Sequence, residues 1–278
     1  MTRSCVMRGG LSVALAAAAL CARAQEASPA AAPRDSGNHV AELQRKAGNG
    51  DPQSQYLLGI AYEHGEGIAQ DDAQALRWYG IAADHGFPPA QNNLAAMYAE
   101  GRGTPRDVTS AMRWYMRAAV AGNAAAQNNL GVLYASGAGI PPDAQEAVRW
   151  FRKSADAHFG PALANLAMMY STGRGVDPDQ GAATKCYEAA AVAGYVPAML
   201  PLGYRYADGV GTPVNVSAAL RWLEQAAQHG SAQAIEKLAA VLQQQAEAGD
   251  GPAREKAAYW RARAQQASAR VQPASAQH

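Results

Sequence analysis

The chain has 278 residues, of which 49% are hydrophobic and only 7% aromatic, and its formal net charge is +1. Its 24 basic residues nearly balance its 23 acidic ones. Phosphate contacts need clustered Lys and Arg, and no basic stripe appears along the chain, so the composition argues against a nucleic-acid-binding surface.

The first 24 residues have the pattern of a secretory signal peptide. Arg3 and Arg8 precede a short apolar segment at residues 11–21, and an Ala-Arg-Ala cleavage site ends at Ala24. The apolar segment is well short of the roughly 20 residues that cross a bilayer, which makes a membrane anchor the weaker alternative. We therefore expect cleavage near Ala24 and a mature chain that is periplasmic or secreted, with no transmembrane segment.

Two short segments separate the signal peptide from the main body of the chain. Residues 25–37 are rich in Ala and Pro and show no hydrophobic period, so we expect a disordered linker there. A capping helix is expected next, over residues 38–50.

The main body, residues 51–230, repeats every 36 residues without an insertion. A leucine, a tyrosine and a Gly-x-Gly pair each return at this spacing, which chance does not produce. The leucines are Leu58, Leu94, Leu130, Leu166, Leu202 and Leu238, and the tyrosines are Tyr62, Tyr98, Tyr134, Tyr170 and Tyr206. We expect five repeats, spanning residues 51–86, 87–122, 123–158, 159–194 and 195–230.

Each repeat is predicted to hold two helices. In the first repeat Ser54, Leu58 and Tyr62 lie four residues apart on one helical face, and a second helical period runs over residues 75–83. A small residue follows the leucine in each repeat, as Gly59 does. We expect this residue to let the neighbouring helix approach closely.

Capping residues mark the ends of the second helices. Their predicted starts carry Asp or Asn, at Asp71, Asp107, Asp143, Asp179 and Asn215. Their predicted ends carry glycine, which suits a left-handed backbone, at Gly50, Gly86, Gly122, Gly194 and Gly230. His158 takes the glycine place once, and we expect local strain there because a β-carbon disfavours that conformation.

The pattern is broken at three places. Pro201 lies inside the expected first helix of the fifth repeat, and its missing N–H predicts a kink or a late helix start. Cys186 takes the place of a recurring tryptophan and is the one cysteine left after signal cleavage, so we expect a small buried residue and no internal disulfide. Residues 231–268 have lost the glycine pair and the tyrosine, which predicts a degenerate capping repeat, followed by a disordered tail at 269–278.

These residues resemble the Sel-1-like repeat (SLR) family, a 36-residue relative of the tetratricopeptide repeats. The resemblance is carried by the segment AQNNLAAMYAEGRGT at residues 90–104 and recurs through nearly all of the mature chain. It implies an all-α fold, a right-handed superhelix (solenoid) of about six helix-turn-helix repeats whose first helices line a concave groove. Such proteins usually act as adaptors that assemble complexes, and exported bacterial members often serve envelope assembly or host contact.

The implied groove holds the candidate partner-binding residues. Asn93, Asn129 and Asn165 share one column of the first helices, directly before the leucine. In tetratricopeptide domains that bind extended peptides, asparagines at the matching place hydrogen-bond the ligand backbone, and an amide suits this task because it both donates and accepts. The alternative is that these asparagines bond only neighbouring backbone. Further candidates are Asn92, Asn128, Gln91 and Gln127, with Glu100 and Arg205 as weaker ones.

No catalytic or metal-binding motif is present in the sequence. It lacks S-x-x-K, G-x-S-x-G, H-E-x-x-H and G-x-x-x-x-G-K, and its histidines form no H-x-x-x-H pair. We expect a non-enzymatic protein that needs no metal or cofactor and binds a protein or an extended peptide.

Two other functions stay open. One is a cell-wall or β-lactam-related enzyme, by analogy with a disulfide-stapled branch of the family, although this chain has none of that branch's cysteine pairs. The other is a structural subunit that packs through its convex face.

Overall fold

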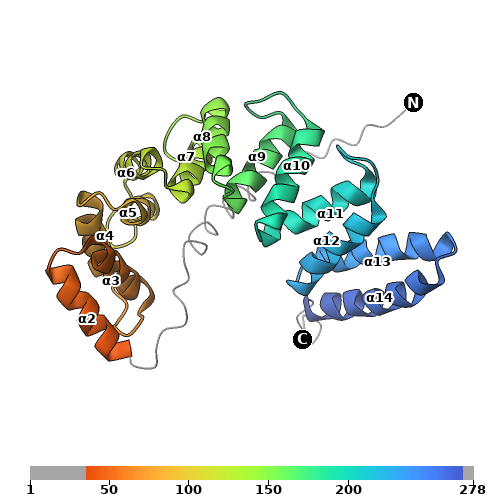
Figure 1. The fold of residues 1–278 in the computed structure, drawn as a ribbon, viewed down its shortest axis with the longest axis horizontal. Helices are drawn as coiled ribbons and strands as arrows, with labels where there is room; N and C mark the ends of the chain where they lie inside the picture. Colours follow the sequence, from red (N-terminus) through yellow and green to blue (C-terminus); the bar gives the residue numbers. More distant parts are fainter. Residues whose placement is uncertain (1–35, 272–278) are drawn as a thin grey trace, which may run out of the picture. The chain divides into compact units, whose positions relative to one another are not determined.

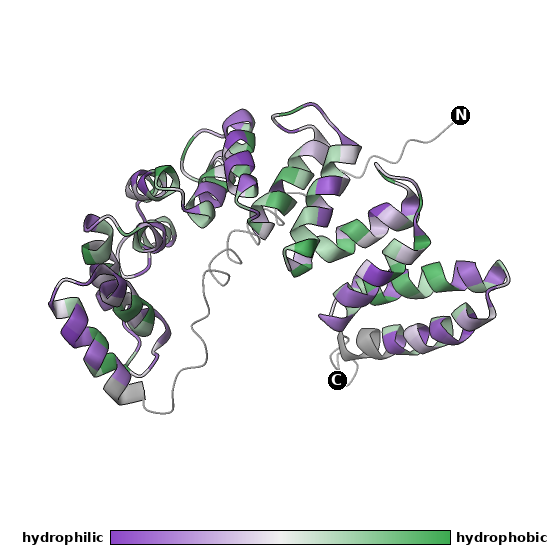
Figure 2. Ribbon diagram, in the orientation of Figure 1, coloured by the Kyte–Doolittle hydropathy of each residue, from purple (hydrophilic) through white to green (hydrophobic). Residues whose placement is uncertain are grey.

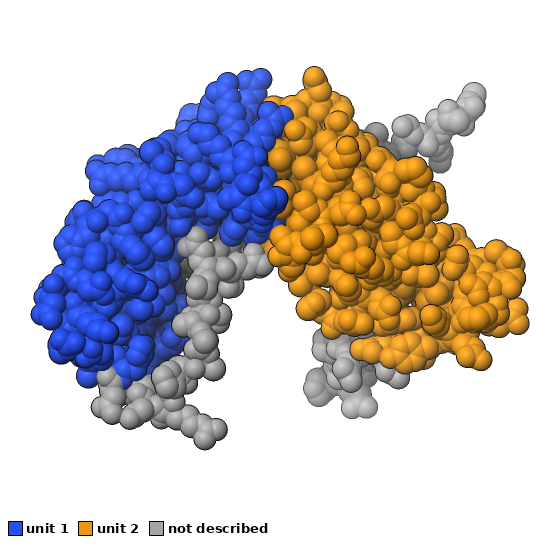
Figure 3. All heavy atoms as spheres, in the orientation of Figure 1, with its two compact units in different colours: residues 1–161 blue, residues 162–278 orange. Residues whose placement is uncertain are grey.

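The computed structural model describes residues 36–271, and over this range it contains α-helices and one short 3-10 helix but no strand (Figure 1). The predicted signal peptide, residues 25–35 of the predicted linker and residues 272–278 of the predicted tail lie outside the described range. The chain forms two compact units, residues 1–161 and 162–278 (Figure 3). None of the helices in the described range combines the length and the apolar character needed to cross a membrane.

Unit 1 contains, in its described part, an N-terminal helix and three helix pairs. The N-terminal helix α2 (Ser36–Gly48) starts at Ser36 rather than at residue 38 and packs against α3. The pairs are α3 (Pro52–His64) with α4 (Asp72–Asp84), α5 (Pro88–Glu100) with α6 (Val108–Val120), and α7 (Ala124–Ser136) with α8 (Ala144–Asp156). The 36-residue period is therefore a period of helix pairs, as predicted.

Unit 2 begins within α9 and ends with the predicted capping repeat. Its elements are α9 (Gly160–Thr172), α10 (Gln180–Val192), the 3-10 helix η1 (Val196–Ala198), α11 (Met199–Asp208), α12 (Val216–Gln228), α13 (Ala232–Glu247) and α14 (Gly251–Val271). The last two helices pack against each other, and α14 continues past residue 268 to Val271.

The fifth repeat starts its first helix late, as Pro201 predicts. The 3-10 helix η1 comes first, and α11 then has 10 residues where α3 has 13. Pro201 is the third residue of α11, so its missing N–H falls in the first turn, where helix amides have no partner within the helix. A proline in that turn disturbs the helix far less than one in its interior.

The predicted helix caps are present. Each Asp or Asn accepts a hydrogen bond from a backbone N–H of the first turn that it caps; these residues are Asp71, Asp107, Asp143, Asp179 and Asn215. His158 has a φ of 56° and is the one non-glycine residue with a positive φ in the described part of the chain. The turn thus keeps the conformation that Gly122 adopts one repeat earlier, in spite of the steric conflict that a β-carbon brings.

The helices of a pair approach closely because a small residue faces a large one. A β-carbon added at Gly131 in α7 would lie 2.6 Å from two ring carbons of Phe151 in α8. The corresponding distances are 2.6 Å from Gly59 to the Tyr79 ring and 2.7 Å from Gly203 to the Leu223 side chain. The predicted role of this column is confirmed.

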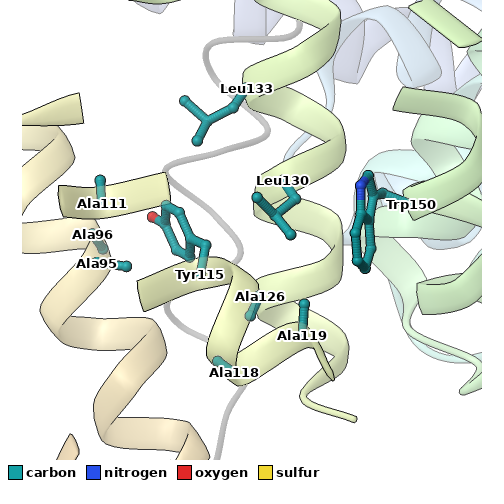
Figure 4. Close-up of a cluster of buried hydrophobic side chains, with 10 residues drawn as sticks. All are labelled: Ala95, Ala96, Ala111, Tyr115, Ala118, Ala119, Ala126, Leu130, Leu133 and Trp150. Atoms are coloured by element: carbon teal, nitrogen blue, oxygen red, sulfur yellow. The ribbon is translucent and has the colours of Figure 1, made fainter. Parts of the chain in front are cut away.

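Between neighbouring pairs of unit 1, alanines bring the helices together around larger side chains. One cluster draws on α5 to α8 and contains Ala95, Ala96, Ala111, Tyr115, Ala118, Ala119, Ala126, Leu130, Leu133 and Trp150 (Figure 4). Hydrophilic and hydrophobic residues alternate along the helices of both units (Figure 2). Cys186 is half-buried rather than buried as predicted; in its column Trp78 and Trp114 are also half-buried, whereas Trp150 and Trp222 are buried.

Candidate partner-binding site

Four of the predicted asparagines form a hydrogen-bonded chain in unit 1. Asn92 and Asn93 lie on α5, and Asn128 and Asn129 lie on α7. The Nδ2 atom of Asn128 donates to Oδ1 of Asn129 at 3.5 Å, and Nδ2 of Asn129 donates to Oδ1 of Asn92 at 3.1 Å. Asn92 in turn donates through Nδ2 to Oδ1 of Asn93 at 3.2 Å. We call these four residues the amide chain.

The amide chain is buried except at one end. The exposed fractions are 0% for Asn128, 9% for Asn129 and 2% for Asn92, whereas Asn93 is half-buried. Buried polar groups are costly unless they are hydrogen-bonded, and bonds in a sequence of donors and acceptors strengthen one another. The buried members of the amide chain therefore hold the side chain of Asn93 in one orientation.

At Asn93 the amide chain continues into a buried phenol and carboxylate. Asn93 is hydrogen-bonded to the hydroxyl of Tyr79, which is fully buried and donates to Oε2 of Glu63 at 2.6 Å. Burial, the charge of Glu63 and the bond to Glu63 raise the pKa of Tyr79 far above its ordinary value, and the bond from Asn93 only partly offsets this. Tyr79 therefore stays protonated and serves as a fixed donor.

Arg102 compensates the buried charge of Glu63. The carboxylate is 4% exposed, and its Oε1 accepts a close hydrogen bond from Nη2 of Arg102. Asp72 Oδ1 lies 3.8 Å from Nη2 of Arg102, and Glu100 Oε2 lies 3.6 Å from its Nε. Burial acts to lower the pKa of Arg102, but the charge of Glu63, the hydrogen bond to it and the charges of Asp72 and Glu100 together outweigh burial, and the pKa is raised. The site thus ends in an ion pair between Glu63 and Arg102.

Sequence reasoning missed Glu63, Tyr79 and Arg102. The available signal was departure from the repeat, because the column of Glu63 elsewhere carries Ala99, Ala135, Ser171 and Ala207. A buried carboxylate in a column of small residues has no role in stacking that the other repeats need.

The predicted glutamines have a structural use. Nε2 of Gln91 donates to the carbonyl of Ala83 at 3.1 Å, and Nε2 of Gln127 donates to the carbonyl of Ala119 at 3.0 Å. Both carbonyls belong to the last turn of the preceding second helix, where backbone acceptors lack partners within the helix. Oε1 of Gln91 is buried without a hydrogen bond among the described residues.

The remaining candidates are placed as follows. Asn165 lies on α9 and is 3% exposed, and Arg205 lies on α11 and is 9% exposed; both belong to unit 2, so neither is part of the amide chain of unit 1. Glu100 is exposed at the end of α5. Within residues 36–271 no three His, Cys, Asp or Glu side chains are grouped as a metal ion would require.

Comparison with known protein families and structures agrees with this architecture. The Sel1 repeat model matches residues 52–87, 88–123, 124–159, 160–195 and 196–231, each one residue later than the repeats predicted from the period. No curated protein matches the chain.

Two solved structures are similar in both sequence and fold. A Sel1 repeat protein from Oxalobacter formigenes is 30% identical, with a TM-score of 0.71, over 84% of this chain and 99% of that protein. A protective antigen of uropathogenic Escherichia coli with an SLR fold is 32% identical, with a TM-score of 0.67, over 79% of this chain. The match spans only 51%, about half, of the Escherichia coli protein. An immunity protein from Pseudomonas aeruginosa shares the fold at 19% identity and a TM-score of 0.52, over 80% of this chain and 84% of that protein.

Proposed function

Because the chain belongs to the Sel1 repeat family, we propose that it is an exported scaffold that binds a protein or peptide segment along the first helices of its repeats. The observation that carries this proposal is the amide chain, which runs from buried Asn128 on α7 to half-buried Asn93 on α5. We propose a place in envelope assembly or host contact; the similar Escherichia coli protein is a protective antigen, which supports host contact.

Asn93 has the hydrogen-bonding capacity that an extended peptide needs. Its Oδ1 accepts from Asn92, and its amide is bonded to the hydroxyl of Tyr79. An asparagine amide carries two hydrogens and two lone pairs, so one hydrogen and one lone pair of Asn93 have no partner within residues 36–271. A peptide backbone offers a carbonyl and an N–H that match this pair whatever its sequence. Tyr79 and the amide chain fix the orientation in advance, which lowers the entropy lost on binding.

The test is affinity capture from envelope extract with the wild type, Asn93→Ala and Gln228→Ala. Gln228 is an exposed amide on α12, so its removal controls for the loss of a surface amide. One lost hydrogen bond of about 1 kcal/mol corresponds to roughly fivefold weaker binding. We expect the partner to be recovered with the wild type and Gln228→Ala and depleted with Asn93→Ala. Equal recovery by a fully helical Asn93→Ala variant would remove Asn93 from the binding site.

We propose that the protein has no catalytic role. A general acid or base must be free to exchange a proton with a substrate. Glu63 is bound by both Tyr79 and Arg102, and Tyr79 cannot ionise near neutral pH, which supports a positional role for these groups. Incubation of the purified protein with a labelled penicillin should give neither a covalent adduct nor turnover; either result would favour the enzyme alternative.

Export is also a proposal. It is supported by the signal-peptide pattern of residues 1–24. N-terminal sequencing of the protein from a periplasmic or culture-medium fraction should give a chain that begins at Gln25. An intact N-terminus found only in the cytoplasmic fraction would contradict export.

A structural subunit that packs through the second helices is the second candidate. The feature on this side is a pair of exposed valines, each the last residue of a second helix, where a contact of this kind would cover them. Val120 at the end of α6 is 77% exposed, and Val192 at the end of α10 is 71% exposed.

A further inference from the structure

Arg205 stands in a column of the repeat that is otherwise apolar. At 36-residue intervals before it come Ala61, Met97, Leu133 and Met169, and all four are buried. Arg205 is 9% exposed, so a guanidinium occupies a place where the other repeats put an apolar side chain. An arginine stays charged under all ordinary conditions, so this place carries a nearly buried positive charge.

Within the described residues, every hydrogen bond of this guanidinium goes to a neutral oxygen. Its Nε donates to Oγ1 of Thr184 at 2.7 Å, and its Nη1 donates to Oγ of Ser171 at 3.2 Å. Its Nη2 donates to the backbone oxygen of Gln180 at 2.8 Å and to Oε1 of the same residue at 2.7 Å. The ring of Tyr187 lies 5.7 Å from the guanidinium carbon. Within the described residues of unit 2, no carboxylate pairs with Arg205.

Unit 1 provides an internal comparison. In unit 1, Arg102 pairs with Glu63 and lies near Asp72, and Tyr79 donates a hydrogen bond to Glu63. The residues three repeats later in the same columns are Ser171, Gln180 and Tyr187, which surround Arg205. The tyrosine is thus kept, while both acids are replaced by neutral side chains.

A buried charge is expensive unless an opposite charge compensates it. Arg102 has Glu63 and Asp72 for this purpose, and Arg205 has no such partner in its unit. Desolvation lowers the pKa of Arg205, in contrast to the raised pKa of Arg102. The site around Arg205 therefore favours an anion that comes from outside its own set of contacts.

We propose that Arg205, together with Ser171 and Gln180, binds a carboxylate group of another molecule. Nη1 carries two hydrogens and uses one for Ser171, so one stays available. Gln180 is exposed, so its side-chain amide can move away from Nη2 and leave a second hydrogen beside the first. Two parallel N–H groups form the fork that matches the two oxygens of a carboxylate. This site does not depend on the amide chain or on the function proposed for it.

The carboxylate has two possible sources, which the experiment separates. The full mature chain is labelled with ¹⁵N-arginine, and the Nε–H resonance of Arg205 is assigned by its loss in Arg205→Met. Methionine is chosen because the same column carries Met97 and Met169 in other repeats. The protein is then titrated at neutral pH with potassium acetate, with potassium chloride as the ionic-strength control, and with a glutamate peptide blocked at both ends. Acetate tests a free carboxylate, and the blocked peptide tests a side chain of a protein segment.

Ser171→Glu supplies the missing acid from within the chain, as Glu63 does in the first repeat. Thr172→Glu is the matched control, because it adds the same charge one residue away at an exposed place. We expect Ser171→Glu to weaken carboxylate binding about tenfold or more, since a like charge then occupies the site. Thr172→Glu should bind as the wild type does.

A shift of the Arg205 resonance with acetate and with peptide supports a site for any carboxylate, and a shift with peptide alone supports a site for an acidic protein segment. The proposal is overturned if the resonance shifts with neither probe. It is also overturned if potassium chloride reproduces the shift, or if the shift is equally large in Ser171→Glu and in Thr172→Glu. If Ser171→Glu fails to fold, the wild-type titration against chloride still decides.

Discussion

Alanine at Gly131 tests the close approach of the two helices in a repeat. The added β-carbon would lie 2.6 Å from Cδ1 and Cε1 of Phe151 and 3.0 Å from its Cζ. Carbon atoms normally pack about 3.5–4.0 Å apart, so the overlap approaches 1 Å. Phe151 is fully buried and cannot turn out of the way without displacing its neighbours. Overpacking of this kind typically destabilises a protein by about 1–3 kcal/mol.

Alanine also favours a helix over glycine by about 0.5–1 kcal/mol, which opposes the overpacking. Gly80→Ala isolates that gain, because Gly80 lies inside α4 and an added β-carbon there meets nothing within 4 Å. The helix-propensity contribution is common to both variants and cancels in their difference. Gly131→Ala should therefore be less stable than Gly80→Ala by the overpacking contribution alone, about 1–3 kcal/mol.

Urea unfolding followed by far-UV circular dichroism measures this difference. We expect the midpoint of Gly80→Ala to rise above that of the wild type and the midpoint of Gly131→Ala to fall below it, with unchanged slopes. Equal midpoints for the two variants would refute the reasoning, because the Phe151 ring would then have room for the new carbon.

Three further predictions concern the buried network and one turn of unit 1. Glu63→Gln leaves the charge of Arg102 without its closest partner and should destabilise the protein by about 1–3 kcal/mol in urea unfolding, since Asp72 and Glu100 stay near the guanidinium. Because the pKa of Tyr79 is raised in the folded state, the unfolded state releases this proton first; wild-type stability should fall as the pH rises above about 10, and less steeply in Tyr79→Phe. His158→Gly removes a β-carbon from a left-handed turn and should raise the free energy of unfolding by up to about 1 kcal/mol, seen as a higher urea midpoint. A lower midpoint would show that the histidine side chain stabilises the turn.

The helix pairs could be predicted from the sequence because their determinants are local and repeat. Cap residues, left-handed glycines and a small residue opposite a large one recur from repeat to repeat, so one repeat supports the interpretation of the next. Pro201 was also informative, since the loss of one amide hydrogen has the same consequence in any helix.

The site was only half predictable, because it depends on the offset between neighbouring helices. The asparagine columns were visible at a spacing of 36, but Asn129 bonds Asn92, which is 37 residues earlier. The period does not show that Gln91 reaches back to Ala83 at the end of the preceding helix. Glu63 and Arg102 are 39 residues apart and meet only once, so no recurring spacing pointed to them.

Site-specific photo-crosslinking in living cells tests most directly whether the first helices bind a partner. One crosslinking residue replaces Pro89, which is half-buried one turn before Asn93 on the same face of α5, and the other replaces Arg117, which is exposed on α6. The scaffold proposal predicts that a protein is captured from position 89, not from position 117, and that Asn93→Ala reduces its yield. Capture from position 117 alone would contradict it and would assign binding to the second helices.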